Sequence, residues 1–125
     1  MMAAKHPIIE ALTTIVGPNG IVHDPGELHV YECDGFPIAK GLPLAVVFPT
    51  DTHQVAQCVE AINKHDVAII PRGSGTGVAG GCVSFGDGVL ISTSRMTRIE
   101  SIDLDNRVAV VQAGVRNTAI SDAIA

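Results

Sequence analysis

The segment from residue 71 to residue 81 holds the residue types most suited to binding chemistry. It reads PRGSGTGVAGG, with five glycines in the nine positions from 73 to 81. Glycine costs backbone entropy on folding, so this density is expected where the chain needs positive φ angles or where another group approaches the backbone. Backbone N–H groups turned inward form an anion-binding nest, and each hydrogen bond to a charged oxygen contributes about 1.5–3 kcal/mol. The segment is therefore suited to a phosphate, and above all to a pyrophosphate, which can engage several amides at once.

Side chains in and beside this segment add to that chemistry. Ser74 and Thr76 supply hydroxyl donors on short side chains, and Arg72 supplies a fork of donors at the rim. Cys82 is interpreted as a small residue that lets the backbone pack near a ligand, and a reactive thiol is the alternative. The alternative for the whole segment is a turn-rich surface loop, but its position in the chain argues against that.

The elements before the glycine-rich segment place it at the end of a buried strand. Residues 44–48 are a continuous apolar run followed by proline, typical of a strand that is buried on both faces. A helix follows, with Asp51 and Gln54 as a capping box, and residues 67–70 form a second apolar strand. This strand, helix, strand order predicts a parallel crossover. Open α/β sheets bind their ligands at the carboxyl ends of such strands.

The other elements follow from apolar periodicity and turn residues. A helix is expected over 8–16, ended by Gly17, whereas residues 19–43 show no sustained period and are interpreted as irregular. Three more elements are expected after the glycine-rich segment: a strand over 89–92, a hairpin of 99–102 with 108–111, and a final helix capped by Asn117. Because the apolar face of that helix stops at Ala125, the sequence is expected to be truncated at its C-terminus.

The glycine-rich segment matches GxGxxG at residues 75–80, a pattern that opens a helix in nicotinamide-dinucleotide proteins. Here only residues 81–88 separate the pattern from the next expected strand, and this interval holds Gly86 and Gly88. A crossover helix does not fit into it. The segment also lacks the GK[ST] ending of a nucleoside-triphosphatase loop. The pattern therefore favours a phosphate-binding loop of another kind.

The order of these motifs resembles the FAD-linked oxidases of the vanillyl-alcohol oxidase superfamily, whose cofactor module is the PCMH-type FAD-binding domain. The resemblance runs from about Tyr31 through Pro49 and the glycine-rich segment to the QAGV motif of residues 112–115. Within the superfamily it points to the subgroup of the glycolate oxidases and D-lactate dehydrogenases. It implies an α+β fold, the first subdomain of the FAD-binding domain, with a small parallel strand-helix-strand sheet, a hairpin and flanking helices. Residues 1–43 would form an N-terminal helix and irregular lead-in, and residues 44–125 the FAD-binding subdomain.

The resemblance also implies the cofactor and its contacts. The FAD pyrophosphate would contact a set of backbone amides and short side chains: Arg72, Gly73, Ser74, Gly75, Thr76, Gly77, Gly81 and Cys82. Some relatives attach the flavin covalently through a histidine in this loop. Thr76 stands at that position here, so noncovalent FAD is expected.

The reaction implied by the resemblance is the oxidation of a 2-hydroxy acid, such as glycolate or D-lactate, to the 2-oxo acid, with two electrons passing to FAD. Partner subunits that carry the electrons onward belong to the same expectation. No catalytic residue is assigned here, because the segments that follow in relatives complete the substrate site. The chain alone is expected to be inactive. Two alternatives stay open: a phosphate- or nucleotide-binding module without redox function, and a structural remnant without ligand affinity.

The composition weighs against several other classes of function. With 46% hydrophobic and 17% charged residues the 125-residue chain is globular, and a net charge of -5 argues against nucleic-acid binding. No apolar run approaches the ~20 residues that cross a bilayer, so direct membrane insertion is not expected, and residues 1–6 do not resemble a signal peptide. The five histidines show no metal-binding spacing. Three isolated cysteines argue against a disulfide framework or zinc site and favour a cytoplasmic protein.

Overall fold

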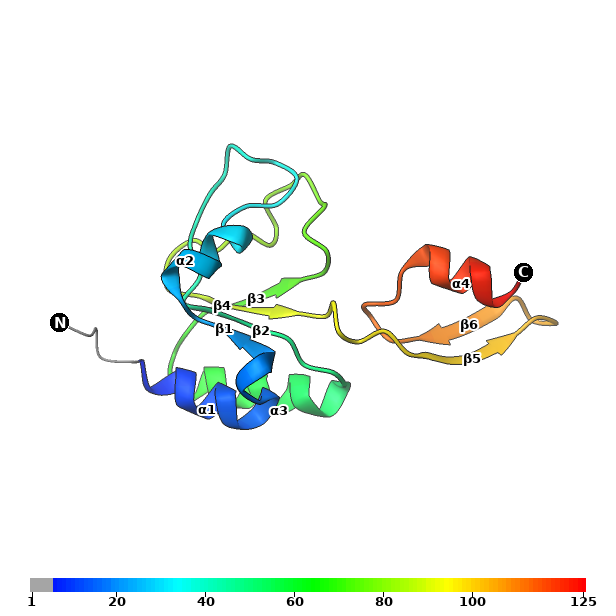
Figure 1. The fold of residues 1–125 in the computed structure, drawn as a ribbon, viewed down its shortest axis with the longest axis horizontal. Helices are drawn as coiled ribbons and strands as arrows, with labels where there is room; N and C mark the ends of the chain where they lie inside the picture. Colours follow the sequence, from blue (N-terminus) through cyan, green and yellow to red (C-terminus); the bar gives the residue numbers. More distant parts are fainter. Residues whose placement is uncertain (1–5) are drawn as a thin grey trace.

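A mixed four-stranded sheet organises the larger part of the molecule (Figure 1). The structure is a computed structural model and describes residues 6–125. The strands are β1 (Ile21–Val22), β2 (Ala45–Val47), β3 (Ile69–Arg72) and β4 (Val89–Ser92), in the order β1-β2-β4-β3. β1 is antiparallel to β2, while β2, β4 and β3 are parallel to one another. The α+β class expected from the sequence is confirmed.

Helices cover both faces of this sheet. The longer helices, α1 (Pro7–Val16) and α3 (Thr52–Asn63), pack side by side on one face, and the short α2 (Pro25–Leu28) lies on the other (Figure 1). Side chains of a strand alternate between the two faces, so the central strands contribute to two cores. The core under α1 and α3 includes Leu12, Val47 and Ile62, and the core on the other face is built from Leu28, Val46 and Leu90. β2 is thus buried on both faces, as predicted, and β4 is buried as well. The prediction that the strand after α3 is also buried is wrong: β3 is only partly buried, because it lies at the edge of the sheet.

Pairing with β4 sets the limits of β3. The strand expected over 67–70 spans Ile69–Arg72 instead, because β4 begins at Val89, which pairs with Ile69. β4 also lies between β2 and β3, so the two strands of the predicted crossover are parallel but not neighbours. Pro71, which has no N–H to donate, is accommodated because β3 is an edge strand.

The prediction that residues 19–43 are irregular is wrong in part. Two short 3-10 turns, η1 (Pro18–Gly20) and η2 (His29–Tyr31), together with β1 and α2, occupy its first half. The first turn of α2 is capped by Asp24, whose Oδ1 accepts a hydrogen bond from the Gly26 N–H at 2.9 Å. Elements of two to four residues are too short to produce a period in the sequence. Residues 1–5 of the predicted lead-in lie outside the described residues.

A smaller part of the molecule follows β4, and we call it the hairpin part. It consists of β5 (Ile99–Asp103), the antiparallel β6 (Val108–Val111) and α4 (Asn117–Ala123), and it extends away from the sheet (Figure 1). The hairpin was predicted correctly. The prediction that Asn117 caps the last helix is wrong: Asn117 is the first helical residue, and the N-cap residue, Arg116, makes no side-chain capping bond. Among residues 6–125, no helix combines the length and apolar character needed to cross a bilayer.

Candidate functional site

The glycine loop, residues 73–81, starts where β3 ends. No helix or strand is present between β3 and β4, so the loop does not open a helix as a nicotinamide-dinucleotide fingerprint would. It begins at the carboxyl end of a parallel strand, the edge of the sheet where ligands bind in open α/β folds. Position and connection both agree with the prediction.

The backbone N–H groups of this loop are left unused by the fold. Within the part of the chain that the structure describes, none of the N–H groups from Gly73 to Ala79 donates a hydrogen bond to a protein acceptor. Most of these residues are exposed, so their N–H groups are open to water or to a ligand. A run of consecutive unused donors is therefore the feature that a pyrophosphate-binding loop must have, and the loop fits this group.

The glycines keep the loop open to a ligand. Gly75 and Gly80 adopt left-handed φ values of 73°, which favour glycine. At Gly73, Gly77 and Gly81 a β-carbon would meet no other atom within 4 Å, so open space borders the backbone there. A large anion can therefore approach these amides without displacing protein atoms.

Two hydroxyl groups lie beside the unused amides. Ser74 Oγ and Thr76 Oγ1 are 3.1 Å apart, and the bond between them is exposed. Each hydroxyl can rotate its hydrogen toward an acceptor. The loop therefore offers side-chain and backbone donors on adjacent residues.

Arg72 lies under the loop, in contrast to the rim position expected for it. Its Nη1 donates to the carbonyl oxygen of Cys33 at 3.0 Å and contacts Cys82 Sγ at 3.4 Å, and its guanidinium lies 5.6 Å from the centre of the Tyr31 ring. A β-carbon at Gly75 would collide with the same guanidinium. Arg72 thus supports the loop from within the protein, and its direct contact with a cofactor stays a prediction.

A segment far away in the sequence is bonded to the glycine loop. We call it the strap, residues 33–36. The N–H of Gly35 donates to the carbonyl oxygen of Gly77 at 2.7 Å, and the N–H of Gly80 donates to Asp34 Oδ2 at 2.9 Å. The sequence did not predict this contact. Nothing in a single sequence links Asp34 to a residue 46 positions later; the Asp-Gly pair indicates only a turn.

A charged cluster lies next to the strap. Glu32 Oε1 accepts a hydrogen bond from Lys40 Nζ at 2.7 Å, and its Oε2 lies 3.0 Å from Nδ1 of His29. The bond from Lys40, followed by the contact with His29, lowers the pKa of Glu32, and the same bond raises the pKa of Lys40. Glu32 and Lys40 therefore form an ion pair next to the strap, in which the two charges offset each other.

The QAGV motif joins the hairpin part to the sheet. Gly114 donates its N–H to the carbonyl oxygen of Met96 at 2.9 Å, and a β-carbon on Gly114 would overlap the carbonyl oxygen of Thr93. This glycine therefore serves close packing within the protein. Gln112 accepts a hydrogen bond from the Arg98 N–H at 2.8 Å with its Oε1.

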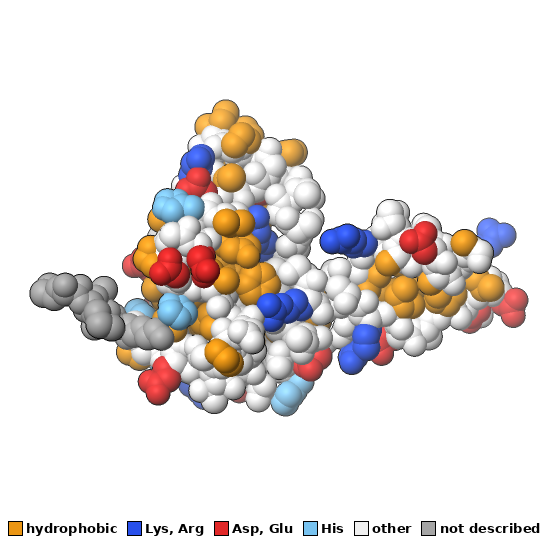
Figure 2. All heavy atoms as spheres, in the orientation of Figure 1, with side chains coloured by type: hydrophobic (Ala, Val, Ile, Leu, Met, Phe, Trp, Pro, Cys, Tyr) orange, Lys and Arg blue, Asp and Glu red, His pale blue; other side chains and the backbone are white. Residues whose placement is uncertain are grey.

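The surface is hollowed between the sheet and the hairpin part (Figure 2). In Figure 1 the loop that leaves β3 lies on one side of this notch and the start of α4 on the other. The surface above β3 is mostly white in Figure 2, as expected for backbone and small polar side chains. The unused amides of the glycine loop therefore lie in a part of the molecule that a ligand can reach.

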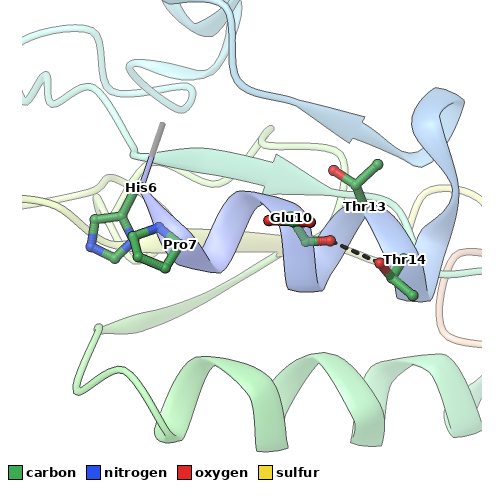
Figure 3. Close-up of a pocket in the computed structure, with 5 residues that line it drawn as sticks. All are labelled: His6, Pro7, Glu10, Thr13 and Thr14. Carbon is green, nitrogen blue, oxygen red and sulfur yellow. Dashed lines mark hydrogen bonds between the residues drawn. The ribbon is translucent and has the colours of Figure 1, made fainter. Parts of the chain in front are cut away.

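A separate cavity of about 410 Å³ lies against α1 (Figure 3). Its lining residues are His6, Pro7, Glu10, Thr13 and Thr14. It shares no residue with the glycine loop, and the carboxylate of Glu10 disfavours an anion there. Among residues 6–125 no three His, Cys, Asp or Glu side chains gather as they would around a metal ion, and the three cysteines are free thiols.

The comparison with protein families matches residues 43–125 to the FAD binding domain. Glycolate oxidase subunit GlcD of Escherichia coli (strain K12) is 38% identical over 118 residues, which cover 94% of this chain and 24% of that protein. D-lactate dehydrogenase of Archaeoglobus fulgidus is 38% identical over 78 residues, or 62% of this chain and 17% of that protein.

Among solved structures, 4-ethylphenol oxidase from Gulosibacter chungangensis superimposes with a TM-score of 0.83 at 25% identity, covering 94% of this chain and 23% of that one. The chain thus spans about a quarter or less of the length of the proteins it matches. The family match covers the glycine loop, both strands beside it and the hairpin part. This chain belongs to the FAD binding domain family.

Proposed function

We propose that this chain forms the pyrophosphate-binding part of the FAD site in a flavin-dependent oxidoreductase that oxidises a 2-hydroxy acid, of the glycolate or D-lactate type, to the 2-oxo acid. The single observation that carries the proposal is the run of unused N–H groups from Gly73 to Ala79, at the carboxyl end of a parallel strand. Membership of the FAD binding domain family supports FAD as the ligand of these amides.

In the proposed complex, backbone and side-chain groups of the glycine loop bind the pyrophosphate together. The amides from Gly73 to Gly77 donate to its oxygens, the hydroxyls of Ser74 and Thr76 add two donors, and Gly81 and Cys82 lie at the far end of the loop. FAD, when bound, supplies the two-electron chemistry of the reaction. The share of this chain is to bind and orient the cofactor. The loop contains no histidine, which supports noncovalent attachment.

The substrate class rests on the relatives. Glycolate and D-lactate, in the names of the two relatives described above, are both 2-hydroxy acids. The Escherichia coli relative is named as a subunit, which supports an assembly with partner subunits that take up the electrons. Three free cysteines support a reducing, cytoplasmic location for this chain as well.

A ligand series tests the proposal. The chain is titrated by calorimetry with FAD, ADP and inorganic phosphate, and we expect FAD to bind most tightly and phosphate most weakly, with at least about a tenfold ratio of Kd between them. ADP separates recognition of the diphosphate from recognition of the rest of FAD. Equal affinity for the three ligands would favour a simple phosphate-binding module, and lack of binding to FAD would contradict the proposal. Release of the flavin into the supernatant on acid precipitation checks the noncovalent attachment.

A further inference from the structure

We propose that Asp34 is a positioning residue for the FAD pyrophosphate: through the strap it holds the glycine loop in the conformation that keeps the loop amides available. The inference rests on the proposed function and deepens it. Asp34 is one of the few buried polar residues, with only 9% of its surface exposed. It lies outside the loop and is not among the residues expected to contact the cofactor.

Both oxygens of the Asp34 carboxylate hold backbone N–H groups. Oδ1 accepts from the N–H of Phe36 at 2.7 Å, which fixes the turn of the strap, and Oδ2 accepts from the N–H of Gly80 at 2.9 Å. A carboxylate that accepts two backbone bonds in a buried position is a strong and geometrically defined link. Asp34 therefore connects the internal shape of the strap to the position of the loop.

Two further bonds make the link continuous along the loop. Gly77 accepts from the N–H of Gly35 at 2.7 Å, and Arg72, directly before the loop, donates to the carbonyl oxygen of Cys33 at 3.0 Å. The strap thus holds the loop at its start, its middle and its end. The bonds use the carbonyl of Gly77 and the N–H of Gly80, and they leave the N–H groups between Gly73 and Ala79 free.

Gly35 provides the room that the strap needs. A β-carbon on Gly35 would lie 2.8 Å from the carbonyl oxygen of Gly77 and 2.9 Å from that of Thr76. Any larger residue would have to push the loop away. Asp34 therefore supplies the acceptor for the N–H of Gly80, and Gly35 lets the strap lie close enough to the loop for this bond to form.

Preorganisation is the physical reason why the strap matters for binding. A loop rich in glycine loses much backbone entropy when it becomes ordered. If the strap orders the loop on folding, this loss no longer opposes FAD binding, and the affinity rises without any new contact to the ligand. The negative charge of Asp34 acts in the opposite direction, because it repels a phosphate. Neutralising Asp34 therefore weakens FAD binding if the ordering of the loop dominates, and strengthens FAD binding if the repulsion dominates.

The test compares Asp34→Asn with Asp87→Asn. Both variants remove one negative charge, but Asp87 is exposed, lies just before β4 and makes no bond to the strap. Asparagine can accept at only one of the two N–H groups, so Asp34→Asn loosens the strap. We expect its Kd for FAD to rise about tenfold, with faster hydrogen–deuterium exchange at the bonded N–H groups of Gly35, Phe36 and Gly80 in the chain without ligand. We expect Asp87→Asn to bind FAD as tightly as the unmodified chain, or more tightly.

Gly35→Ala provides a second variant that changes no charge and keeps Asp34. We expect it to weaken FAD binding in the same direction, which keeps the test available if Asp34→Asn does not fold. If the unmodified chain binds FAD and both strap variants bind it equally well or better, the inference about Asp34 is wrong and the proposed function stands. If the unmodified chain does not bind FAD, the proposed function fails first and the inference fails with it. Thermal unfolding of each variant, compared with its Kd, separates loss of loop order from loss of the fold.

Discussion

The side-chain amide of Gln112 donates a hydrogen bond to the carbonyl oxygen of Thr50 at 3.3 Å, and so ties the end of β6 to the segment between β2 and α3. Through its Oε1 the same side chain holds the N–H of Arg98, at the start of the hairpin part. The hairpin has few buried side chains: Val108 and Val110 are each 52% exposed. A hairpin of two strands is marginal by itself, so this polar connection contributes to holding it against the sheet.

Replacing Gln112 by alanine tests this connection. Because a net contribution of roughly 0.5–1.5 kcal/mol is typical of one such hydrogen bond, we expect the free energy of unfolding to fall by about 1 kcal/mol. Hydrogen–deuterium exchange should increase mainly at residues 98–112. Gln57→Ala, at an exposed position of α3, is the matched control and should change little. An equal effect of the two substitutions would show that Gln112 does not connect the parts.

The core beneath α1 and α3 predicts a contrast between two isoleucines. Ile62 is fully buried there, whereas Ile38 is 82% exposed. Removing one buried methylene costs roughly 0.5–1.5 kcal/mol, so Ile62→Val should lower the free energy of unfolding by about 1 kcal/mol. Ile38→Val should change it by less than about 0.5 kcal/mol. Urea denaturation measures both, and a larger effect at Ile38 would contradict the observed packing.

Burial of Cys58 predicts a dependence on pH. Desolvation raises the pKa of this thiol from 9.0 to about 11. The unfolded chain then loses its proton at lower pH than the folded chain, so the contribution of Cys58 to stability is complete below pH 9 and is lost as the pH rises toward 11.

Two substitutions and one reagent check this prediction. The loss of stability between these pH values should be smaller in Cys58→Ala than in Cys33→Ala, because only the former removes the buried thiol. In the unmodified chain iodoacetamide at pH 8 should alkylate Cys33 and Cys82 before Cys58. Early alkylation of Cys58 in the folded chain would contradict the burial.

Two glycines of the loop predict different consequences of the same substitution. Gly75 has φ 73° and faces the Arg72 guanidinium, so Gly75→Ala should destabilise the chain, by about 1–2 kcal/mol from the left-handed conformation alone. Gly73 has open space around its β-carbon position, so Gly73→Ala should leave the unfolding temperature nearly unchanged. Its methyl group would instead occupy space that the pyrophosphate needs, and the Kd for FAD should rise. Full FAD affinity in Gly73→Ala would argue against a ligand at this backbone.

Part of this structure could be predicted from the sequence because the signals are local. The Asp51 cap is an example: its Oδ1 accepts from the Gln54 N–H at 2.9 Å, as the capping pattern predicts. The second half of that capping box differs, since Gln54 Oε1 accepts from the N–H of Thr50 and not from that of Asp51. The glycine loop was likewise found from composition and from its place after an apolar strand.

What the sequence did not reveal depends on contacts between distant residues. The insertion of β4 between β2 and β3 follows from pairing among three separate segments, and no local pattern encodes that order. The strap depends on the meeting of Asp34 with Gly80, and the inward position of Arg72 depends on Cys33 and Tyr31. These residues lie next to one another only in the folded chain.

Backbone amide NMR of the isotope-labelled chain during a titration with FAD tests the central claim most directly. The pyrophosphate is expected at the amides from Gly73 to Gly77, so their resonances should move furthest and should move downfield, as N–H groups do when they bond to a charged oxygen. Inorganic phosphate should affect the same amides at higher concentration. If FAD leaves these resonances in place, or moves only those of the α1 residues that line the cavity of Figure 3, the pyrophosphate does not bind at the glycine loop.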